Sequence, residues 1–274
     1  MKRNILTLCF ILTVTMIDGQ SGSDFRELQA VNWESRVVAN GITLKTALTS
    51  LFNSAQAVYL VETDTAGGLI ELGVAASDST LATSAYAAQE KVIAAVNGTF
   101  FNMKEGFNVH YVQVDDSKVA VTDEKEFGIR ATGVFTAEGE AADISMWGPE
   151  REDAGTVTAE DAIVSGPLLI DNGVDIPLDS INFNTSRHPR TMVGVTAKGH
   201  LLFVVVDGRQ PGYADGMSLF ELRTLARSLG CTDALNLDGG GSTTLYVSGY
   251  GTNGVVNKPS GKVERPVPSI VFVR

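Results

Sequence analysis

Apolar positions along this chain fall into short runs, and most of these runs have the length and β-branched composition of strands. The runs that predict buried strands are residues 57–61, 69–74, 92–96, 191–196, 201–206, 234–237, 244–247 and 267–273. Two stretches have helical features instead, the alanine-rich residues 78–91 and residues 217–229, where apolar side chains recur three or four positions apart. The pattern therefore predicts an α+β fold with a mixed, largely antiparallel β-sheet core and a few packed helices.

Both predicted helices have residues that are typical of helix ends. Ser77 or Asp78 is a suitable N-terminal cap for the first helix. In the second, Ser218 followed three residues later by Glu221 is a capping-box pattern, and Gly230 is a typical stop. We therefore expect the second helix to end before Gly230.

The start of the chain differs in composition from the rest. Two basic residues and an apolar run over 5–17 open the chain, which is typical of a secretory signal and too short to span a membrane. We expect residues 1–20 to be this signal. The mature protein is then exported, periplasmic, cell-surface or secreted, and has no integral membrane span.

Charge and cysteine content limit the kinds of function that this chain can have. The formal net charge of the 274 residues is −11, so no general positive field attracts nucleic acid, and any phosphate must be held by a few focused cations. Beyond the signal the chain has one cysteine, Cys231, which we expect to be a buried structural thiol. Three scattered histidines give no zinc-site spacing. We expect no cofactor, and the sequence leaves the need for a metal and the oligomeric state open.

A glycine-rich loop is the most distinctive local feature of the chain. Three consecutive glycines, Gly239, Gly240 and Gly241, follow Asp238 at the end of a predicted strand, and Ser242 and Thr243 come next. Backbone N–H groups of such a loop can form an anion-binding concavity, to which the two hydroxyls can add donors. The alternative is a tight turn between strands.

Two other apolar strands also end in polar or glycine-rich clusters. The strand before Asn97 runs into Gly98, and residues 202–206 run into Asp207-Gly208-Arg209. Strand ends of this kind can converge on one site, because binding residues lie on loops held by a rigid sheet. The sequence predicts a shared pocket formed by these ends and the glycine loop.

Three arginines near these clusters are candidate anion clamps. Arg190 opens an apolar strand, Arg209 follows Asp207-Gly208, and Arg265 precedes a proline. A guanidinium group can hold phosphate or carboxylate through two parallel hydrogen bonds. The alternative is a structural pair between aspartate and arginine across the loops.

The candidate catalytic acids are Asp238, Glu221 and Asp207. Glycoside hydrolysis commonly uses two carboxyl groups. Glu221 has a competing explanation, because a capping-box glutamate needs no catalytic role. His188 is a candidate general acid or base, or else a conformational residue before Pro189.

The order of these motifs resembles the phosphodiester glycosidase family over roughly residues 90–274. The resemblance implies that residues 90–274 are the catalytic domain, and residues 21–89 are then an N-terminal extension with strands and a helix. The matching segments are residues 97–101, 165–169, 188–191, 206–209, 216–222, 235–243, 257–260 and 264–267. The family more often has a second glycine where Thr99 stands here.

The resemblance implies cleavage of a sugar joined through its anomeric carbon to a phosphodiester, in a small substrate or a cell-envelope glycan. Arg190, Arg209 and the glycine loop would then hold phosphate, and Asp238 with Glu221 or Asp207 would act at the anomeric centre. Two alternatives are a non-catalytic binder of phosphorylated or envelope glycans and a phosphodiesterase that attacks phosphorus.

Overall fold

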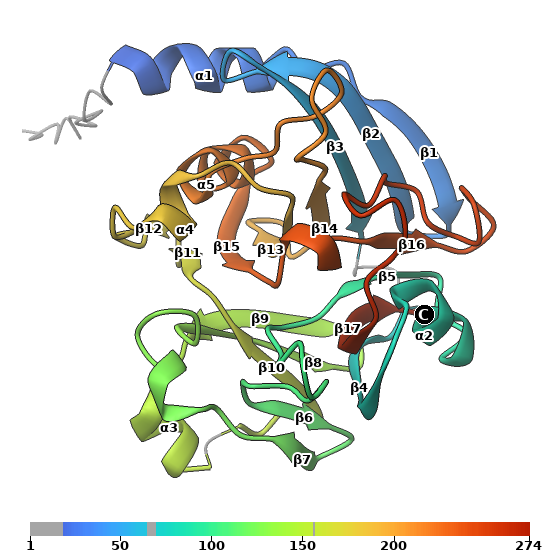
Figure 1. The fold of residues 1–274 in the computed structure, drawn as a ribbon, viewed down its shortest axis with the longest axis vertical. Helices are drawn as coiled ribbons and strands as arrows, with labels where there is room; N and C mark the ends of the chain where they lie inside the picture. The colour runs from blue at the N-terminus through green and yellow to red at the C-terminus, as the bar shows by residue number, and fades with distance from the viewer. Residues whose placement is uncertain (1–18, 65–69, 156) are drawn as a thin grey trace, which may run out of the picture.

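Three antiparallel sheets form the frame of the protein, which the computed structural model describes for residues 19–64, 70–155 and 157–274 (Figure 1). The eight-stranded sheet has the order β1 (Glu34–Ala39), β2 (Ile42–Leu51), β3 (Ser54–Thr63), β14 (Leu201–Val206), β13 (Arg190–Thr196), β15 (Cys231–Asn236), β11 (Leu168–Asp171) and β12 (Val174–Asp175). The five-stranded sheet has the order β7 (Ser117–Ala120), β6 (Val112–Val114), β10 (Asp161–Ser165), β8 (Gly133–Glu138) and β9 (Ala141–Met146). The four-stranded sheet has the order β16 (Leu245–Val247), β5 (Ala94–Asn97), β17 (Val267–Val273) and β4 (Leu72–Leu81).

Short helices accompany the sheets. The α-helices of the described residues are α1 (Gly19–Gln29), α2 (Thr83–Gln89), α3 (Pro149–Asp153), α4 (Asn182–Thr185) and α5 (Leu219–Ser228), and two 3₁₀ turns are η2 (Glu124–Glu126) and η3 (Gly240–Ser242). In Figure 1 the eight-stranded sheet lies above the five-stranded sheet, and β4, β17 and α2 lie to the right. The α+β class predicted from the sequence is confirmed, and the pairings between the named strands are antiparallel.

Strand β14 shows how the apolar runs build the core. All six of its residues are buried, because the sheet is covered on both faces. Leu202, Val204 and Val206 pack with α1 and α5 on one face, while alternate residues such as Phe203 and Val205 pack toward the other two sheets. Side chains of a strand alternate between faces, so a strand buried on both faces reads as a continuous apolar run.

Helix α5 confirms the capping pattern. Ser218 accepts a hydrogen bond from the Glu221 backbone N–H, and the Glu221 side chain accepts one from the Ser218 N–H. The buried face of the helix consists of Leu219, Leu222, Leu225 and Ala226. This face packs on one face of the eight-stranded sheet, against residues such as Val204 and Ala234.

The predicted N-terminal extension supplies strands to two of the sheets. β3 pairs with β14 over residues 58–63, and β4 pairs with β17, the last strand of the chain. The first strands therefore share hydrogen-bonded sheets with residues 90–274. The predicted signal falls almost wholly within residues 1–18, which lie outside the described part of the chain. Residues 65–69 also lie outside it, and they include the first residue of the predicted strand 69–74.

The predicted start of the first helix is wrong. Residues 77–81 continue β4, because Leu81 pairs with Val267 and Ala76 pairs with Ser269 in β17. Helix α2 begins only at Thr83, after Ala82, which gives no side-chain cap. Pairing with a neighbouring strand has overridden the local helical preference of the alanine-rich segment.

The structure also describes the surroundings of Cys231 and the lengths of the helices. Cys231 is a buried free thiol, as predicted, and burial raises its pKa to about 12. In the part of the chain that the structure describes, no helix is both long and apolar enough to cross a membrane.

Candidate active site

The glycine loop lies against three other chain segments, and each glycine makes one close approach. A Cβ atom on Gly239 would lie 2.7 Å from the Pro189 carbonyl oxygen. One on Gly240, whose φ of 62° also favours glycine, would lie 3.1 Å from an Arg209 guanidinium nitrogen. One on Gly241 would lie 2.6 Å from the Arg265 Cζ atom. The absence of side chains therefore lets two guanidinium groups pack against the loop.

Asp238 begins this loop and lies in a positive environment. Burial raises the pKa of its carboxyl group, against the opposing effects of the Ser242 hydroxyl, the Gly239 N–H and the positive charges of Arg265 and Arg130. Asp238 Oδ1 accepts the Gly239 N–H at 2.8 Å. The residue keeps partial contact with solvent. Its carboxyl group itself is buried near two arginines.

Asn97 holds the backbone at Asp238. Its side-chain amide donates to the Asp238 carbonyl oxygen at 2.7 Å, and its Oδ1 accepts from the Thr191 hydroxyl at 2.7 Å and from the Thr244 N–H at 3.2 Å. The side chain is fully buried. Asn97 therefore joins β5, β13 and the glycine loop, and its amide is occupied by protein groups.

Ser242 and Thr243 have different surroundings within the loop. Ser242 Oγ lies 3.5 Å from an Arg265 guanidinium nitrogen and interacts with Asp238. Thr243 is buried, and its hydroxyl has no hydrogen-bond partner among the described residues. Ser242 is thus the hydroxyl that links the acid to a cation.

Arg209 and His188 form one rim of the site. The Arg209 guanidinium lies 3.2 Å from His188 Nδ1 at its nearest nitrogen, and Arg209 is exposed. Burial together with the charges of Arg190 and Arg209 lowers the pKa of His188. The neutral imidazole can therefore accept a hydrogen bond from Arg209 and leave the rest of the guanidinium for an anion.

Arg190 lies deeper, behind this rim. The residue is 2% exposed, and its guanidinium donates to the carbonyl oxygens of Met217, Phe183 and Ser186 at 2.8–2.9 Å. Burial and the charge of Arg209 lower its pKa to about 10, which still leaves it charged at neutral pH. Arg190 therefore ties the segment of residues 183–186 to Met217 and contributes positive charge from below.

Arg130 is the cation that the sequence analysis missed. Its guanidinium lies 5.3 Å from the Phe100 ring centroid and 5.4 Å from that of Phe183, and its charge acts on Asp238. One sequence feature could have indicated Arg130, namely that it lies shortly before a strand. It precedes β8, much as Arg190 lies at the start of β13. Nothing in the local sequence relates it to Asp238.

Asp207 is surrounded by protein donors. It is 1% exposed, and it accepts from Asn257 Nδ2 at 2.8 Å, the Lys258 N–H at 2.9 Å and the Tyr213 hydroxyl at 3.3 Å. Asn257 also donates to the Thr243 carbonyl oxygen at 3.2 Å. Asp207 thus supports the segment that holds the glycine loop from behind. Burial raises its pKa from 3.8 to about 6, against the effect of these hydrogen bonds.

This shift predicts a pH dependence of stability. The unfolded chain ionises Asp207 near pH 3.8 and the folded protein near 6, so stability falls as the pH rises through that window. We expect the free energy of unfolding of the parent, relative to Asp207→Asn, to fall by about 2 kcal/mol between roughly pH 4 and pH 7. Urea unfolding of both proteins at the two pH values measures this difference. Parallel pH dependences in the two proteins would show that Asp207 keeps an ordinary pKa.

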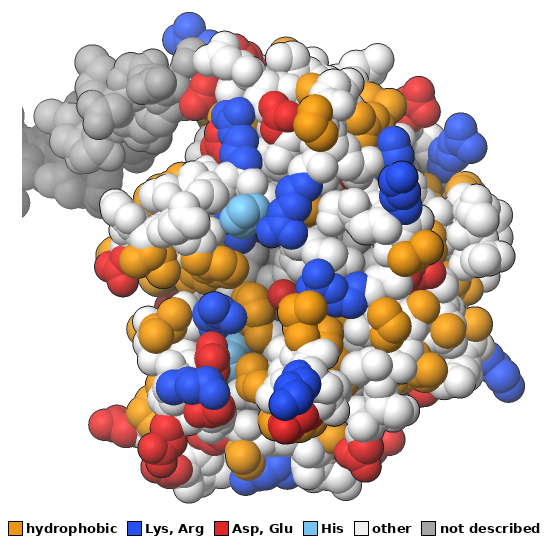
Figure 2. All heavy atoms as spheres, viewed as in Figure 1, with side chains coloured by type: hydrophobic (Ala, Val, Ile, Leu, Met, Phe, Trp, Pro, Cys, Tyr) orange, Lys and Arg blue, Asp and Glu red, His pale blue; other side chains and the backbone are white. Residues whose placement is uncertain are grey.

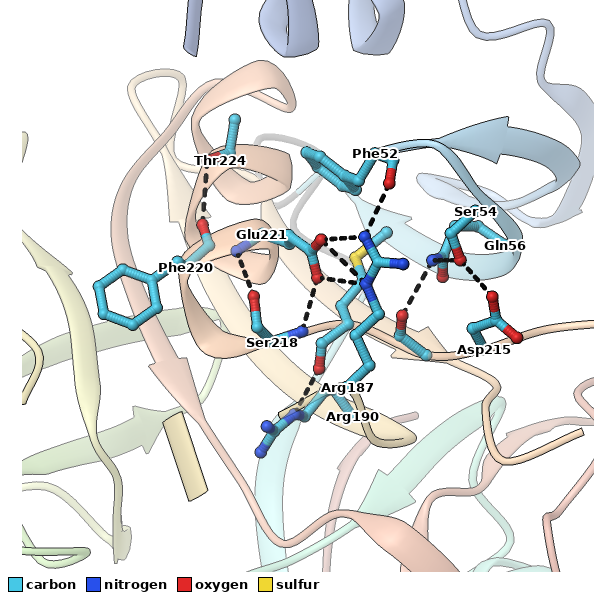
Figure 3. A network of polar contacts seen from close by, with 12 residues as sticks. Phe52, Ser54, Gln56, Arg187, Arg190, Asp215, Ser218, Phe220, Glu221 and Thr224 are labelled. Atoms are coloured by element: carbon cyan, nitrogen blue, oxygen red, sulfur yellow. Dashed lines mark hydrogen bonds and ion pairs between the residues drawn. The ribbon is translucent and has the colours of Figure 1, made fainter. Parts of the chain in front are cut away.

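Glu221 lies in a network of its own, which Figure 3 shows. Both of its oxygens face the guanidinium of Arg187, with Nε at 3.0 and 3.1 Å, and Oε2 also accepts the Ser218 N–H at 2.8 Å. Arg187 donates in turn to the Phe52 carbonyl oxygen at 2.7 Å. Arg190 reaches the same segment through the Met217 carbonyl oxygen. The Glu221 carboxylate is therefore directed toward Arg187 and the start of α5.

The structure brings one acid and several cations together around the glycine loop. Lys and Arg side chains and a histidine surround a recess at the centre of the face shown in Figure 2. The arginines that contact the loop or act on Asp238 are Arg130, Arg209 and Arg265. Such a site can bind an anion and place a carboxylate beside it. Within the described ranges, no group of three or more His, Cys, Asp and Glu residues could hold a metal ion.

Comparisons with known proteins show what this chain is similar to. The uncharacterized SPbeta prophage-derived protein YomE of Bacillus subtilis strain 168 is 36% identical over 81 residues, which are 30% of this chain and only 12% of that protein. A hypothetical protein from Synechocystis superposes with a TM-score of 0.69 at 16% identity, over 89% of this chain and 64% of its own. The catalytic domain of zebrafish N-acetylglucosamine-1-phosphodiester alpha-N-acetylglucosaminidase, auto-inhibited by its pro-peptide, superposes with a TM-score of 0.67 at 16% identity, over 89% and 87% of the two chains.

At 16% identity the two superpositions show a shared fold. The family comparison goes further, because its match to phosphodiester glycosidases spans residues 90–274, more than half of the chain. That span includes the glycine loop and the four arginines of the site. The chain therefore belongs to the phosphodiester glycosidase family.

Proposed function

We propose that this protein hydrolyses the bond between the anomeric carbon of a sugar and a phosphodiester. The observation that carries the proposal is the position of Asp238, on a glycine loop against which Arg209 and Arg265 pack and within reach of the Arg130 charge. A phosphodiester has one negative charge, and it becomes a good leaving group when that charge is neutralised. Family membership supports the same reaction class.

In this proposal the phosphate binds across the glycine loop. Arg209 and Arg265 lie against neighbouring glycines, so an anion above the loop can contact both guanidinium groups and the Ser242 hydroxyl. Arg190 adds charge from below, and Asn97 keeps the loop in place. These donors are fixed before substrate arrives, which favours the charge that develops on the leaving phosphate.

Asp238 would face the anomeric carbon. As the C1–O bond breaks, its electron pair leaves on the phosphate oxygen, positive charge develops at C1, and a carboxylate nearby stabilises that charge. The oxygen of water then joins C1, giving free sugar and a phosphate monoester. The raised pKa of Asp238 suits a group that also accepts the proton of that water.

Glu221 and Asp207 would position this machinery, since each accepts hydrogen bonds from neighbouring protein groups. Glu221→Gln keeps an oxygen for the Ser218 N–H and removes the charge facing Arg187. We therefore expect it to lower the melting temperature by a few degrees and to change kcat for sugar release by less than about fivefold. Thermal unfolding and steady-state kinetics of the same preparation test this. A loss of kcat near that of an Asp238 variant, at unchanged stability, would instead place Glu221 in the chemistry.

Two alternatives use the same recess, a non-catalytic glycan binder and a phosphodiesterase that attacks phosphorus. Incubation with a panel of sugar-1-phosphodiesters and phosphate-linked glycan polymers, with and without excess chelator, separates the three. Free sugar as the first product supports the proposal. Release of sugar-1-phosphate supports attack on phosphorus, and binding without product supports the binder.

We further propose that the protein is exported. The basic start and the apolar run over residues 5–17 support this. Mass analysis of the N-terminal peptide of the mature protein tests this proposal. A mature protein that retains residues 1–20 would contradict it.

A further inference from the structure

A fully buried histidine, His110, has no part in the chemistry assigned to Asp238. It lies between β5 and β6, and its ring centroid is 5.4 Å from that of Phe100. Each ring nitrogen of a histidine is a donor when protonated and an acceptor when not. The neighbours of the two nitrogens therefore indicate where His110 carries protons.

Thr99 determines the state of the first ring nitrogen. The Thr99 hydroxyl donates to the Val164 carbonyl oxygen at 2.6 Å, and its Oγ1 lies 2.9 Å from His110 Nδ1. A hydroxyl has one proton, and two oxygen atoms at 2.6 Å need that proton between them. Thr99 Oγ1 is then the acceptor in its contact with His110, so Nδ1 carries a proton. The glycine that the family more often has at this position would supply no such acceptor.

Glu126 faces the second ring nitrogen. His110 Nε2 has no hydrogen-bond partner among the described residues, and Glu126 Oε2 lies 3.6 Å from it. The two side chains are 0% and 14% exposed, so solvent screens their interaction little. An unprotonated Nε2 would turn its lone pair toward a carboxylate oxygen, whereas a proton on Nε2 makes the contact attractive. The geometry therefore favours an imidazolium paired with a carboxylate.

The charged groups around this pair are consistent with an ionised Glu126. The His110 imidazole, together with the positive charge of Arg130, lowers the pKa of Glu126 against the effect of burial. Asp123 and Lys125 lie close to the pair as well, and they form an ion pair with each other at 2.6 Å. Because their opposite charges largely offset, Glu126 keeps its negative charge beside His110.

Glu126 also holds the segment that carries Arg130. Its backbone carbonyl oxygen accepts the Arg130 N–H at 3.0 Å, and its carboxylate acts on the Arg130 charge. The Arg130 guanidinium lies 5.3 Å from the Phe100 ring centroid, and the same ring contacts His110. The charge of Arg130 acts in turn on Asp238. A chain of direct contacts therefore joins the buried histidine to the candidate catalytic acid.

We propose that a buried ion pair between His110 and Glu126 positions the Arg130 guanidinium. Both are positioning residues, because they reach Asp238 only through Arg130. The inference rests on the proposed function, in which Asp238 acts at the anomeric carbon. Loss of the Nε2 proton would turn the imidazole lone pair against the carboxylate, release Glu126 and free the guanidinium. Activity should therefore fall as the pH rises through this deprotonation.

Nitrogen-15 NMR of the histidine side chains tests the ion pair without any substrate. At neutral pH we expect protons on both ring nitrogens of His110 in the parent, and on Nδ1 alone in Glu126→Gln. The His110 signals are identified by their absence from His110→Gln. Glu124→Gln is the matched control, since Glu124 is exposed and belongs to the same 3₁₀ turn, and it should leave the signals unchanged. An unprotonated Nε2 in the parent would overturn the ion pair.

Steady-state kinetics test the positioning role. Glu126→Gln should lower kcat for sugar release about tenfold, because a small displacement of a positioned group weakens catalysis. In an Arg130→Ala background the same change should cost less than about twofold, which a general loss of stability would not produce. Thr99→Val, which removes the hydroxyl, should also lower kcat, whereas Thr99→Ser should keep the parent value. The parent kcat should have an alkaline limb that is missing in His110→Gln.

The possible results separate the ion pair, its role and the proposed function. Equal losses from Glu126→Gln in the parent and the Arg130→Ala backgrounds would contradict the positioning role, and so would an alkaline limb that persists in His110→Gln. If the parent releases no sugar from any sugar-1-phosphodiester, the proposed function fails. The NMR comparison still decides in that case whether His110 and Glu126 form the ion pair.

Discussion

Replacing Asp238 by Asn is expected to lower kcat for sugar release by about a thousandfold or more while the protein remains folded. Asn keeps an oxygen that can accept the Gly239 N–H, so the start of the glycine loop retains its hydrogen bond. The substitution removes the only negative charge assigned to the anomeric carbon. Because it also removes a negative charge beside Arg265, KM for the phosphodiester should stay the same or fall.

Steady-state kinetics with one sugar-1-phosphodiester measure this effect, and the melting temperature checks the fold. Asp233→Asn is a matched control on β15, the strand that precedes Asp238. Asp233 Oδ1 accepts the Asn172 N–H at the opposite end of that strand, away from the glycine loop. A normal rate for Asp238→Asn would remove Asp238 from the chemistry and with it the proposed arrangement of sugar and phosphate.

Adding one methyl group to the glycine loop should also lower activity strongly. A Cβ on Gly241 would lie 2.6 Å from Arg265 Cζ, closer than carbon atoms can pack, so Gly241→Ala must displace the guanidinium. We expect kcat/KM to fall about a hundredfold, because the phosphate loses a positioned bidentate donor. Gly148→Ala is the control, since a Cβ there meets nothing within 4 Å.

A double-mutant cycle makes this prediction specific to Arg265. If Gly241→Ala acts by moving the guanidinium, it should cause little further loss in an Arg265→Ala background. The same hundredfold loss in that background would mean that the methyl group harms the loop itself, and the assignment of Arg265 to the phosphate would lose its support.

Much of the fold could be predicted from the sequence where a strand is buried on both faces. The predicted limits of β14 and β17 agree with the structure, because every residue of these strands is buried and the apolar run ends where the strand ends. The start of α2 was missed because the preceding residues pair with β17, a strand nearly two hundred positions away. Local preference contains no information about that partner.

The candidate site could likewise be predicted only in part from the sequence. The glycine loop, Asp238 and the arginines at 209 and 265 could be chosen from residue types and family order. The capping role of Glu221 was also visible, since it depends on a spacing of three residues. Arg130 was not visible, because its relation to Asp238 depends on how β8 and the glycine loop pack. The burial of Asp207, and hence its raised pKa, likewise depends on tertiary contacts with Asn257 and Lys258.

Hydrolysis in water enriched in oxygen-18 shows which bond of the phosphodiester breaks. The parent protein is incubated with a sugar-1-phosphodiester, and the phosphate product is analysed by mass spectrometry. Cleavage between C1 and oxygen predicts a phosphate monoester free of the heavy isotope, with the label entering the sugar. Heavy oxygen in the phosphate product would show that water attacks phosphorus and would contradict the account.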